Sequence, residues 1–449
     1  MKRLILWSVI AALAACGPAP SPPPPPPRAE RELAVAIRPG PTTWFVQPDG
    51  EDAGLDRDLA ALFAGEQRLK LRVIPADAPT QLLAGVDGSA ASIAAGGLSR
   101  PVSAGAADLV YTTGYYAVEP VLVYNTAVAR PETWRDLSGE TVGIVDGDLS
   151  DVRMAHPEVL WQAAPQGSES LLEQVSDGTL LYAVVASSEA AVARNVFLNV
   201  EPAFSAGPRQ DLAWALLPAN APLRDAIDAF FARIRKDGTL QRLIDRYFGY
   251  SQRVRRSDAT AFQERIRGVL PTYVGFFHQA QQDTGIDWRL LAAIAYRESR
   301  WDPAATSATN VRGMMMLTEE TAKRMRISDR LDARESILAG SRYLAALRRA
   351  LPQRIRDPDR TWLALAAFNI GLGHLEDARV LAARRGLNPD SWSDLKKTLP
   401  LLVQEDWGAK YGVARGGQAV VFVETVRAYY DVLLRLQEPY YGARLRASR

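Results

Sequence analysis

Two periodicities divide the chain. From Glu32 onward, short apolar runs rich in β-branched residues alternate with amphipathic stretches, beginning with 33–37, 55–62 and 71–74. A strand, a helix and a second strand in that order predict a βαβ unit and a largely parallel sheet. Further apolar runs predict strands at 121–124, 141–145 and 180–185, and helical periodicity covers 223–250 with a break at Asp237-Gly238. Residues 31–250 are therefore predicted to form an α/β domain.

Beyond residue 250 the pattern becomes almost wholly helical. Residues 251–260 (SQRVRRSDAT) are polar and charged, and we expect them to link two domains. After them, apolar positions recur at three and four residues, which predicts amphipathic helices separated by Pro, Gly and Asp. The predicted helices cover 261–282, 288–297, 319–326, 335–350, 361–369 and 418–436. A mainly helical domain is therefore predicted over residues 261–449.

The N-terminus predicts export and lipid attachment. Lys2 and Arg3 precede an apolar stretch, 4–15, that is too short to span a bilayer, as in a signal peptide. It ends in Leu-Ala-Ala before Cys16, the only cysteine, and this ending resembles the lipobox of bacterial lipoproteins. Residues 1–16 are therefore interpreted as a signal peptide and lipobox, with Cys16 as the lipidated residue. The alternative is a chance cysteine at the end of an ordinary signal peptide.

Residues 17–30 are rich in proline (GPAPSPPPPPPRAE) and predict a stiff tether that cannot form a packed core. The resemblance to lipoproteins implies a lipid anchor. In lipoproteins the residue after the lipidated cysteine directs sorting, and the absence of Asp at Gly17 implies the outer membrane. The folded part would then face the periplasm. More than one acyl chain is needed for lasting attachment, and a lipoprotein cysteine carries more than one.

The net charge and the small number of metal-binding side chains limit which partners and cofactors can be expected. Lys plus Arg number 53 against 51 Asp plus Glu, so the net charge of +2 gives no reason to expect a nucleic acid partner. The residues that most often bind transition metals are few and far apart in the sequence: His156, His278, His374 and Cys16. Their spacing matches no metal-binding motif, so neither a metal nor another cofactor is expected.

The first domain has recognisable motifs. Residues 54–60 (GLDRDLA) and 223–241, followed by Tyr-Phe-Gly at 247–249, resemble the extracellular solute-binding proteins of family 3 over 31–250. This resemblance implies a bilobal, periplasmic-binding-protein-like fold that closes on a small ligand, often an amino acid. In the family, an Arg binds the ligand carboxylate and an Asp meets its ammonium.

Alignment with that family places Gly105 at the Arg position and Ser187 at the Asp position, with Arg100 and Glu189 as nearby charges. We therefore expect a muropeptide or stem peptide, and not a free amino acid, as the ligand. Trp44, Phe45 and Tyr115 are the candidate lining residues. A spacer domain that binds nothing is the alternative.

In the second domain, Glu298 stands at an unusual position. Leu291, Ile294, Ala295 and Glu298 recur at three- and four-residue steps, which places the carboxylate on the inward face of a helix that Pro303 ends at about residue 302. An inward carboxyl group favours its neutral form, as a general acid near neutral pH requires. A buried salt bridge to Arg297 or Arg300 is the structural alternative.

Four ordered segments surround this glutamate: 298–307 (ESRWDPAATS), 313–318 (GMMMLT), 366–371 (AAFNIG) and 424–429 (ETVRAY). They resemble the motifs of the transglycosylase SLT family. With the first domain, the whole chain resembles the membrane-bound lytic murein transglycosylase F type. The resemblance implies a lysozyme-like catalytic domain that acts on peptidoglycan glycan strands.

Residue by residue, the resemblance makes Glu298 the catalytic acid and base. It makes the following substrate-binding: Ser307, Met315, Met316, Phe368, Asn369, Gly371, Glu424 and Tyr429. Two positions depart from the broader family, since Met316 stands where Gln is usual and Phe368 replaces a tyrosine. Two of the three methionines at 314–316 are also interpreted as core residues.

A single carboxylate in the motifs favours a lyase. Hydrolases of the usual kind need two carboxylates, whereas Glu298 alone could protonate the glycosidic oxygen and then deprotonate the muramyl C6 hydroxyl, giving a 1,6-anhydro end. Two alternatives stay open. One is a sensor of wall fragments that no longer cuts, and the other is a lysozyme-like hydrolase using Asp302 or Glu319 as its second acid.

Overall fold

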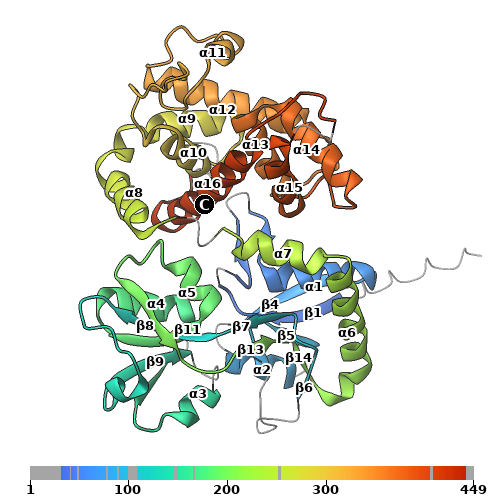
Figure 1. Ribbon diagram of the computed structural model, residues 1–449. Helices are drawn as coiled ribbons and strands as arrows, with labels where there is room; N and C mark the ends of the chain where they lie inside the picture. The colour runs from blue at the N-terminus through green and yellow to red at the C-terminus, as the bar shows by residue number, and fades with distance from the viewer. Residues whose placement is uncertain are drawn as a thin grey trace, which may run out of the picture.

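The structure is a computed structural model that describes residues 32–40, 42–47, 50–76, 79–87, 90–99, 109–145, 150–164, 167–250, 254–404 and 408–440. Its N-terminal part is a bilobal α/β unit and its C-terminal part is helical, which confirms the predicted fold class (Figure 1). Cys16, the tether at 17–30, Arg100 and Gly105 lie outside the described residues. No described helix is long and apolar enough to cross a membrane.

The first lobe is built on a five-stranded sheet of order β4-β1-β5-β14-β6. Strand β1 pairs in parallel with β4 and β5, because helices α1 and α2 provide the crossovers between them, whereas β14 is antiparallel to its neighbours. The strands are β1 Glu32–Ile37, β4 Lys70–Pro75, β5 Ile93–Ala95, β6 Val110–Tyr111 and β14 Ala215–Leu216. Its helices are α1 Leu55–Glu66, α2 Pro79–Asp87, α6 Ala221–Lys236 and α7 Thr239–Phe248, with a short hairpin of β2 Phe45–Val46 and β3 Asp52–Ala53.

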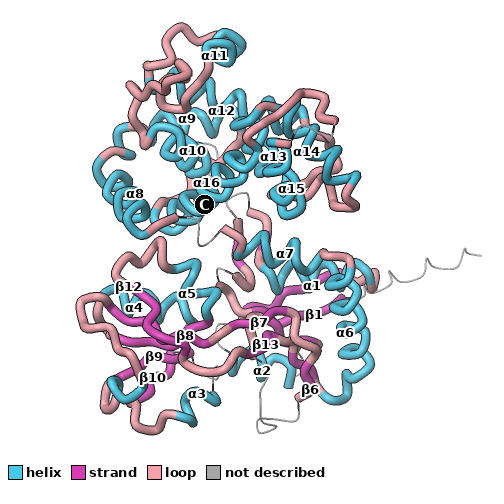
Figure 2. Tube along the Cα trace, viewed as in Figure 1, coloured by secondary structure: helices cyan, strands magenta, loops and turns pink. Residues whose placement is uncertain are grey.

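The second lobe has a sheet of order β10-β9-β11-β8-β12. It is mixed, because β8 runs antiparallel to both β11 and β12, so the prediction of a largely parallel sheet is only partly right. Its strands are β8 Pro120–Asn125, β9 Thr141–Val145, β10 Leu160–Ala164, β11 Tyr182–Ala186 and β12 Val200–Ser205, and its helices are α3 Ser150–Ala155, α4 Ser168–Asp177 and α5 Ser187–Ala193. Strands β7 Tyr116–Val118 and β13 Gln210–Leu212 pair where the chain passes between the lobes (Figure 2).

The C-terminal part contains nine described α-helices: α8 Arg256–Gly268, α9 Val274–Thr284, α10 Trp288–Ser299, α11 Glu319–Met325, α12 Ala333–Ala350, α13 Asp359–Ile370, α14 Leu372–Arg384, α15 Trp392–Thr398 and α16 Gly416–Leu436. Short 3-10 turns occupy Trp134–Leu137, Pro218–Asn220, Leu270–Thr272 and Leu399–Val403. The sequence pattern did not single out α14 and α15.

Two predicted boundaries differ from the structure. The helix expected over 261–282 is divided at Pro271, which cannot continue the hydrogen-bond ladder of α8. The connector expected at 251–260 is shorter, since α8 already begins at Arg256. That arginine bonds to Glu201 and to the Leu198 carbonyl of the second lobe, so the start of α8 is fixed by tertiary contacts.

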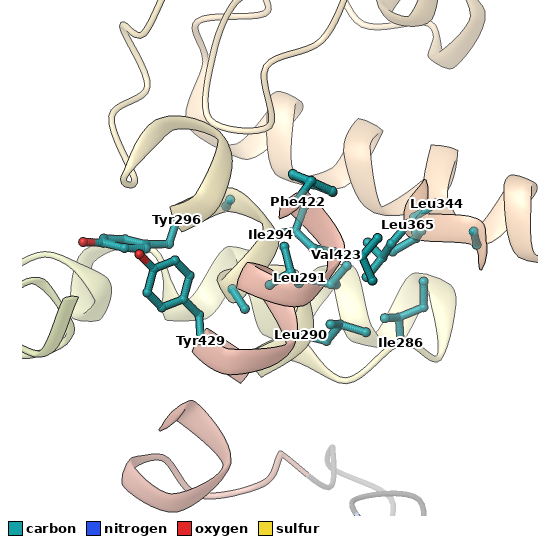
Figure 3. Packing of buried hydrophobic residues seen from close by; sticks show 14 of the residues in the cluster. Ile286, Leu290, Leu291, Ile294, Tyr296, Leu344, Leu365, Phe422, Val423 and Tyr429 are labelled. Carbon is teal, nitrogen blue, oxygen red and sulfur yellow. The ribbon is translucent and has the colours of Figure 1, made fainter. Parts of the chain in front are cut away.

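The core of the helical domain forms around α10 and α16, which pack against each other (Figure 3). Every residue of α10 from Trp288 to Tyr296 is buried. Leu291 and Ile294 of α10 meet Val423 of α16 in this cluster, and α9, α12 and α13 complete its walls. The catalytic-motif glutamate follows this buried run at the end of the same helix.

Candidate active site

Helix α10 is fixed at both ends. The Asp287 side chain accepts the N–H of Arg289 as an N-cap, as the sequence suggested. The helix ends at Ser299, earlier than Pro303 indicated, because Arg300 and Trp301 both adopt left-handed backbone conformations, with φ of 56° and 60°. The Trp301 indole then folds back and donates to the carbonyl of Ala292 at 2.8 Å. Glu298 is therefore in the last turn of a rigid helix.

The Glu298 side chain is partly buried at the end of α10, and its carboxyl is largely removed from water. Burial raises its pKa from 4.5 to about 7, and the nearby positive charge of Arg297 lowers it only in part. In the described part of the chain, the carboxyl forms no ion pair with Arg297 or Arg300. Instead the Arg297 guanidinium lies 5.8 Å from the ring centre of Phe422 in α16. This glutamate therefore has the neutral form available near pH 7, which a general acid needs.

The loop after α10 packs against the end of that helix. Ser299 Oγ donates to the carbonyl of Met314 at 2.9 Å. Gly313 has a φ of 85°, and a Cβ there would lie 1.8 Å from the Arg330 carbonyl oxygen, so only glycine fits. The contact with Ser299 fixes this loop against the last turn of α10, the turn that contains Glu298.

The three methionines divide into two kinds. Met314 and Met315 are fully buried, and Met315 fills the space left by the missing side chain of Gly340. The assignment of Met315 to substrate binding is therefore wrong, and its interpretation as core is right. Met316 is partly exposed with a left-handed φ of 46°, so it is the methionine of this group that can reach a substrate.

Ser307 is held within its own turn. Its hydroxyl accepts the N–H of Val311 at 3.1 Å and lies 3.0 Å from the Thr309 hydroxyl. It shapes the loop that follows α10.

Phe368, Asn369 and Gly371 lie together where α13 meets α14. Phe368 is stacked parallel to Phe422, with ring centres 6.5 Å apart, and so is connected to the side chain of Arg297. Asn369 is exposed, and Gly371 has a φ of 89° that turns the chain into α14. The structure therefore brings this motif to the same region as the end of α10.

Glu424 is not a cleft residue. Its side chain is fully buried, where it accepts from the Trp392 indole at 2.5 Å and from Arg427 at 2.9 Å. Arg427 also donates to the Arg246 carbonyl of α7, at 2.6 Å, and lies between the rings of Tyr250 and Trp362. The motif glutamate thus holds an arginine that joins the two domains, and its assignment to the substrate cleft is corrected.

Tyr429 also differs from its expected role. It is 7% exposed and packs on Tyr296, with ring centres 4.9 Å apart (Figure 3). It also packs on Phe262, with ring centres 4.4 Å apart. Burial raises its pKa to about 12. This tyrosine belongs to the aromatic cluster that joins α8 to α10 and α16.

The two candidates for a second catalytic carboxyl group, Glu319 and Asp302, are more exposed to solvent than Glu298. The Glu319 side chain is 61% exposed and pairs with Lys323, and its hydrogen bond with this lysine lowers its pKa. Asp302 is exposed and accepts the N–H of Ala304. Among the described residues, no group of three or more His, Cys, Asp or Glu side chains could hold a metal ion.

In the N-terminal domain, the predicted lining residues do not face one cleft. Tyr115 is buried and donates to Asp56 at 2.7 Å, at the cleft between the lobes. Trp44 and Phe45 instead line a cavity of about 680 Å³ against Arg435 of α16, so their assignment to the interlobe cleft is wrong. The hydrophobic pattern could not distinguish these two surfaces.

The charges at that cleft differ from those of the alignment. The Ser187 hydroxyl accepts the N–H of Glu119. Glu189, the nearby charge noted in the sequence, pairs across the cleft with Arg38, which sequence reasoning missed. Arg38 directly follows the first strand, and the carboxyl end of a strand in an α/β sheet is where ligands bind, so this signal was present.

A partly buried glutamate with a raised pKa at a helix end, in a helical domain joined to a bilobal α/β domain, is the arrangement of a lysozyme-like enzyme fused to a solute-binding-protein fold. Residues 275–388 match the transglycosylase SLT domain, and residues 33–250 match bacterial extracellular solute-binding proteins, family 3. The chain belongs to the family of membrane-bound lytic murein transglycosylases F.

Two relatives with that name support this statement. The protein from Nitrosospira multiformis is 43% identical over 91% of this chain and 87% of its own. The one from Methylobacillus flagellatus is 40% identical over 98% of this chain and 95% of its own. Among solved structures, an arginine-binding protein from T. maritima covers 49% of this chain and 95% of its own, at 18% identity and a TM-score of 0.44.

Glu298→Gln should stabilise the protein at pH 8 but hardly at pH 5. Because the folded pKa is about 7 and the ordinary value 4.5, the native state holds the proton more tightly, and wild-type stability falls as pH rises through this window. Melting temperatures at the two pH values test this. Glu438→Gln, an exposed carboxyl in the same domain, is the control. An equal increase in the melting temperature of Glu298→Gln at both pH values would contradict a raised pKa for Glu298.

Arg427→Met should lower the free energy of unfolding by about 3 kcal/mol or more, because it leaves Glu424 buried without its hydrogen-bonded cation. The exposed pair Lys323–Glu319 gives the matched control, Lys323→Met, which should leave the urea midpoint nearly unchanged. Equal midpoints for the two variants would show that the buried pair contributes nothing to the fold.

Proposed function

We propose that this chain cleaves the β-1,4 bond between N-acetylmuramic acid and N-acetylglucosamine in peptidoglycan and leaves 1,6-anhydromuramyl ends. One observation carries the proposal: Glu298 has a pKa of about 7 in a dry site, so it can both give and take a proton at neutral pH. The SLT motif around it and the names of the relatives support the substrate class.

The mechanism needs only this one carboxyl group. Protonated Glu298 gives its proton to the glycosidic oxygen as the bond to C1 breaks. The resulting carboxylate takes the proton of the muramyl C6 hydroxyl, whose oxygen attacks C1, so the acid is regenerated without water. Arg297, beside Glu298, favours the carboxylate form that the second half of the cycle requires.

The other cleft contacts come from both sides of Glu298. Met316 and the turn of Ser307 lie on the loop after α10, while Asn369 and Gly371 lie on the α13–α14 junction. We assign these four residues to glycan binding. Phe368 supports the cleft through Phe422 and offers no hydroxyl, so hydrogen bonding to the sugar is left to Asn369.

Two other functions predict different products. A hydrolase using Asp302 or Glu319 as its second carboxylate would leave ordinary reducing ends. In the structure Glu319 pairs with Lys323, and Asp302 accepts the N–H of Ala304 within its own turn. A sensor that no longer cuts would release nothing. The raised pKa of Glu298 favours catalysis over a sensor, and the reducing or anhydro ends of the products distinguish the hydrolase from the lyase.

Glu298→Gln should lower the rate of anhydromuropeptide release by about two to four orders of magnitude, because the proton donor is lost while the side chain keeps its shape. Mass spectrometry of digested peptidoglycan measures the products. Binding to insoluble peptidoglycan should persist, which separates catalysis from folding. Glu438→Gln is the matched control. Activity within a few-fold of wild type would overturn the assignment of Glu298.

We also propose that the protein is anchored in the outer membrane by lipid on Cys16 and faces the periplasm. The lipobox-like ending before Cys16 and the proline-rich tether at 17–30 support this. The relatives are named membrane-bound, although no described helix of this chain is suited to cross a membrane.

Cys16→Ser should move the protein from the membrane fraction to an unprocessed or soluble form, because the acylated thiol is lost. Fractionation and labelled fatty acid in the native host measure this. Incorporation of label into the Cys16→Ser variant as strongly as into wild type would place the lipid elsewhere.

The N-terminal domain is proposed to bind a muropeptide or stem peptide and so to guide or regulate cutting. Both of its lobes contact the helical domain, through Arg246–Asp359 at 3.1 Å from the first lobe and through Glu169–Arg435 from the second. A ligand that changes the angle between the lobes therefore acts on both attachments, provided that it binds one arrangement better than the other.

A further inference from the structure

The cleft between the two lobes is nearly closed. It encloses about 20 Å³, which is room for about one water molecule. Arg38 and Asp56 line it from the first lobe, and Ser188 and Glu189 from the second. A ligand can therefore enter only when the lobes move apart at the β7 and β13 connections.

Arg38 has too few partners for a buried charge. Its side chain is 6% exposed, and Nη2 lies 3.5 Å from Glu189 Oε1, longer than a normal hydrogen bond. Its Nη1 is buried, and no hydrogen-bond partner for it is found among the described residues. Burying a guanidinium that is poorly paired is costly, so such a group needs a functional or structural reason.

In the described part of the first lobe, the neighbouring residues hold the backbone and side chain of Arg38 in place without accepting hydrogen bonds from its guanidinium N–H groups. The Thr43 hydroxyl donates to the Arg38 carbonyl at 2.6 Å. A Cβ on Gly97 would lie 3.2 Å from Arg38 Nη2, and one on Gly96 would lie 2.7 Å from its backbone nitrogen, so backbone passes close to the arginine. Both glycines have positive φ, 119° for Gly96 and 76° for Gly97.

The nearest buried acid in the first lobe does not pair with Arg38. Asp56 Oδ1 accepts from the Tyr115 hydroxyl at 2.7 Å and from the Trp214 indole at 3.0 Å. It contributes negative potential near the guanidinium, but its hydrogen bonds come from these two aromatic side chains and from the Gly96 backbone. Arg38 is thus a preorganised donor that faces the other lobe.

We propose that Arg38 and Glu189 are the ligand anchors of this cleft and that they pair with each other while the lobes are closed. A ligand carrying both a carboxylate and an ammonium separates them, with its carboxylate on the Arg38 guanidinium and its ammonium on Glu189. The planar guanidinium can donate two parallel hydrogen bonds to one carboxylate. Because the anchors lie on different lobes, the bridging ligand fixes the distance between the lobes.

This inference rests on the proposed ligand-binding role of the N-terminal domain and is independent of the chemistry at Glu298. It differs from the sequence argument, in which Gly105 and Ser187 stand at the anchor positions and a zwitterion lacks charged partners there. Arg38 and Glu189 supply those charges from other positions. Free amino acids and the stem peptides of peptidoglycan share the required pair of groups.

The test combines changes in the ligand with changes in the anchors. The full chain is titrated calorimetrically with single amino acids and with stem peptide purified from peptidoglycan. Each probe that binds is also used with its amino groups acetylated or its carboxyl groups amidated. Arg38→Gln and Glu189→Gln are compared with Arg72→Gln and Glu173→Gln, which change exposed charges in the same lobes.

For wild type and both controls, amidation and acetylation should each weaken binding by about tenfold or more, because each removes one buried charge contact. Amidation should have no further effect on Arg38→Gln, and acetylation none on Glu189→Gln. Binding by the amino acids or by the stem peptide alone identifies the source of the ligand.

The proposal is overturned if Arg38→Gln still prefers the free carboxylate, or if neither kind of probe binds the wild type. Thermal melts show whether each variant is folded. If Arg38→Gln does not fold, the comparison of Glu189→Gln with wild type, using the acetylated probe, still tests the proposal. Release of anhydromuropeptides is measured separately with Glu298→Gln. A failed transglycosylase assignment would therefore leave the binding result intact.

Discussion

The dryness of one carboxyl group is the constraint on which the catalytic domain depends. Glu298 follows nine buried residues of α10, and the same packing that removes water from that helix keeps its last turn partly desolvated. A carboxyl group in bulk water would be ionised at neutral pH and could not act as an acid. The apolar core of the helical domain therefore sets the protonation state of the active site as well as the stability of the fold.

Helix α16 connects this core to the rest of the protein. Residues such as Val423 and Tyr429 pack against α10, whereas Arg427 and Arg435 reach the first and second lobes. The helix that helps keep Glu298 dry is thus also the one that both lobes contact. Helix α16 is therefore the described element through which the proposed ligand of the lobes would act on the catalytic domain.

The departures from the SLT pattern fit this arrangement. Phe368 has no hydroxyl, but it stacks on Phe422, and the ring of Phe422 contacts the guanidinium of Arg297, the residue that precedes the proposed acid Glu298. The phenylalanine contributes shape and an apolar surface at this position. Met316, where Gln is usual, similarly offers a flexible and partly exposed apolar side chain, while its two neighbours fill the core.

The sequence alone determined the two-domain fold, the family and the inward position of Glu298, because periodicity and ordered motifs are local properties of the chain. It could not assign Glu424 or Trp44 correctly, since a charged or aromatic residue near a motif looks the same whether it faces a substrate or another domain. Only the tertiary structure brought Glu424 to Trp392 and Arg38 to Glu189. Those pairs join residues on separate helices or lobes, and their partners are decided by packing, which no local pattern encodes.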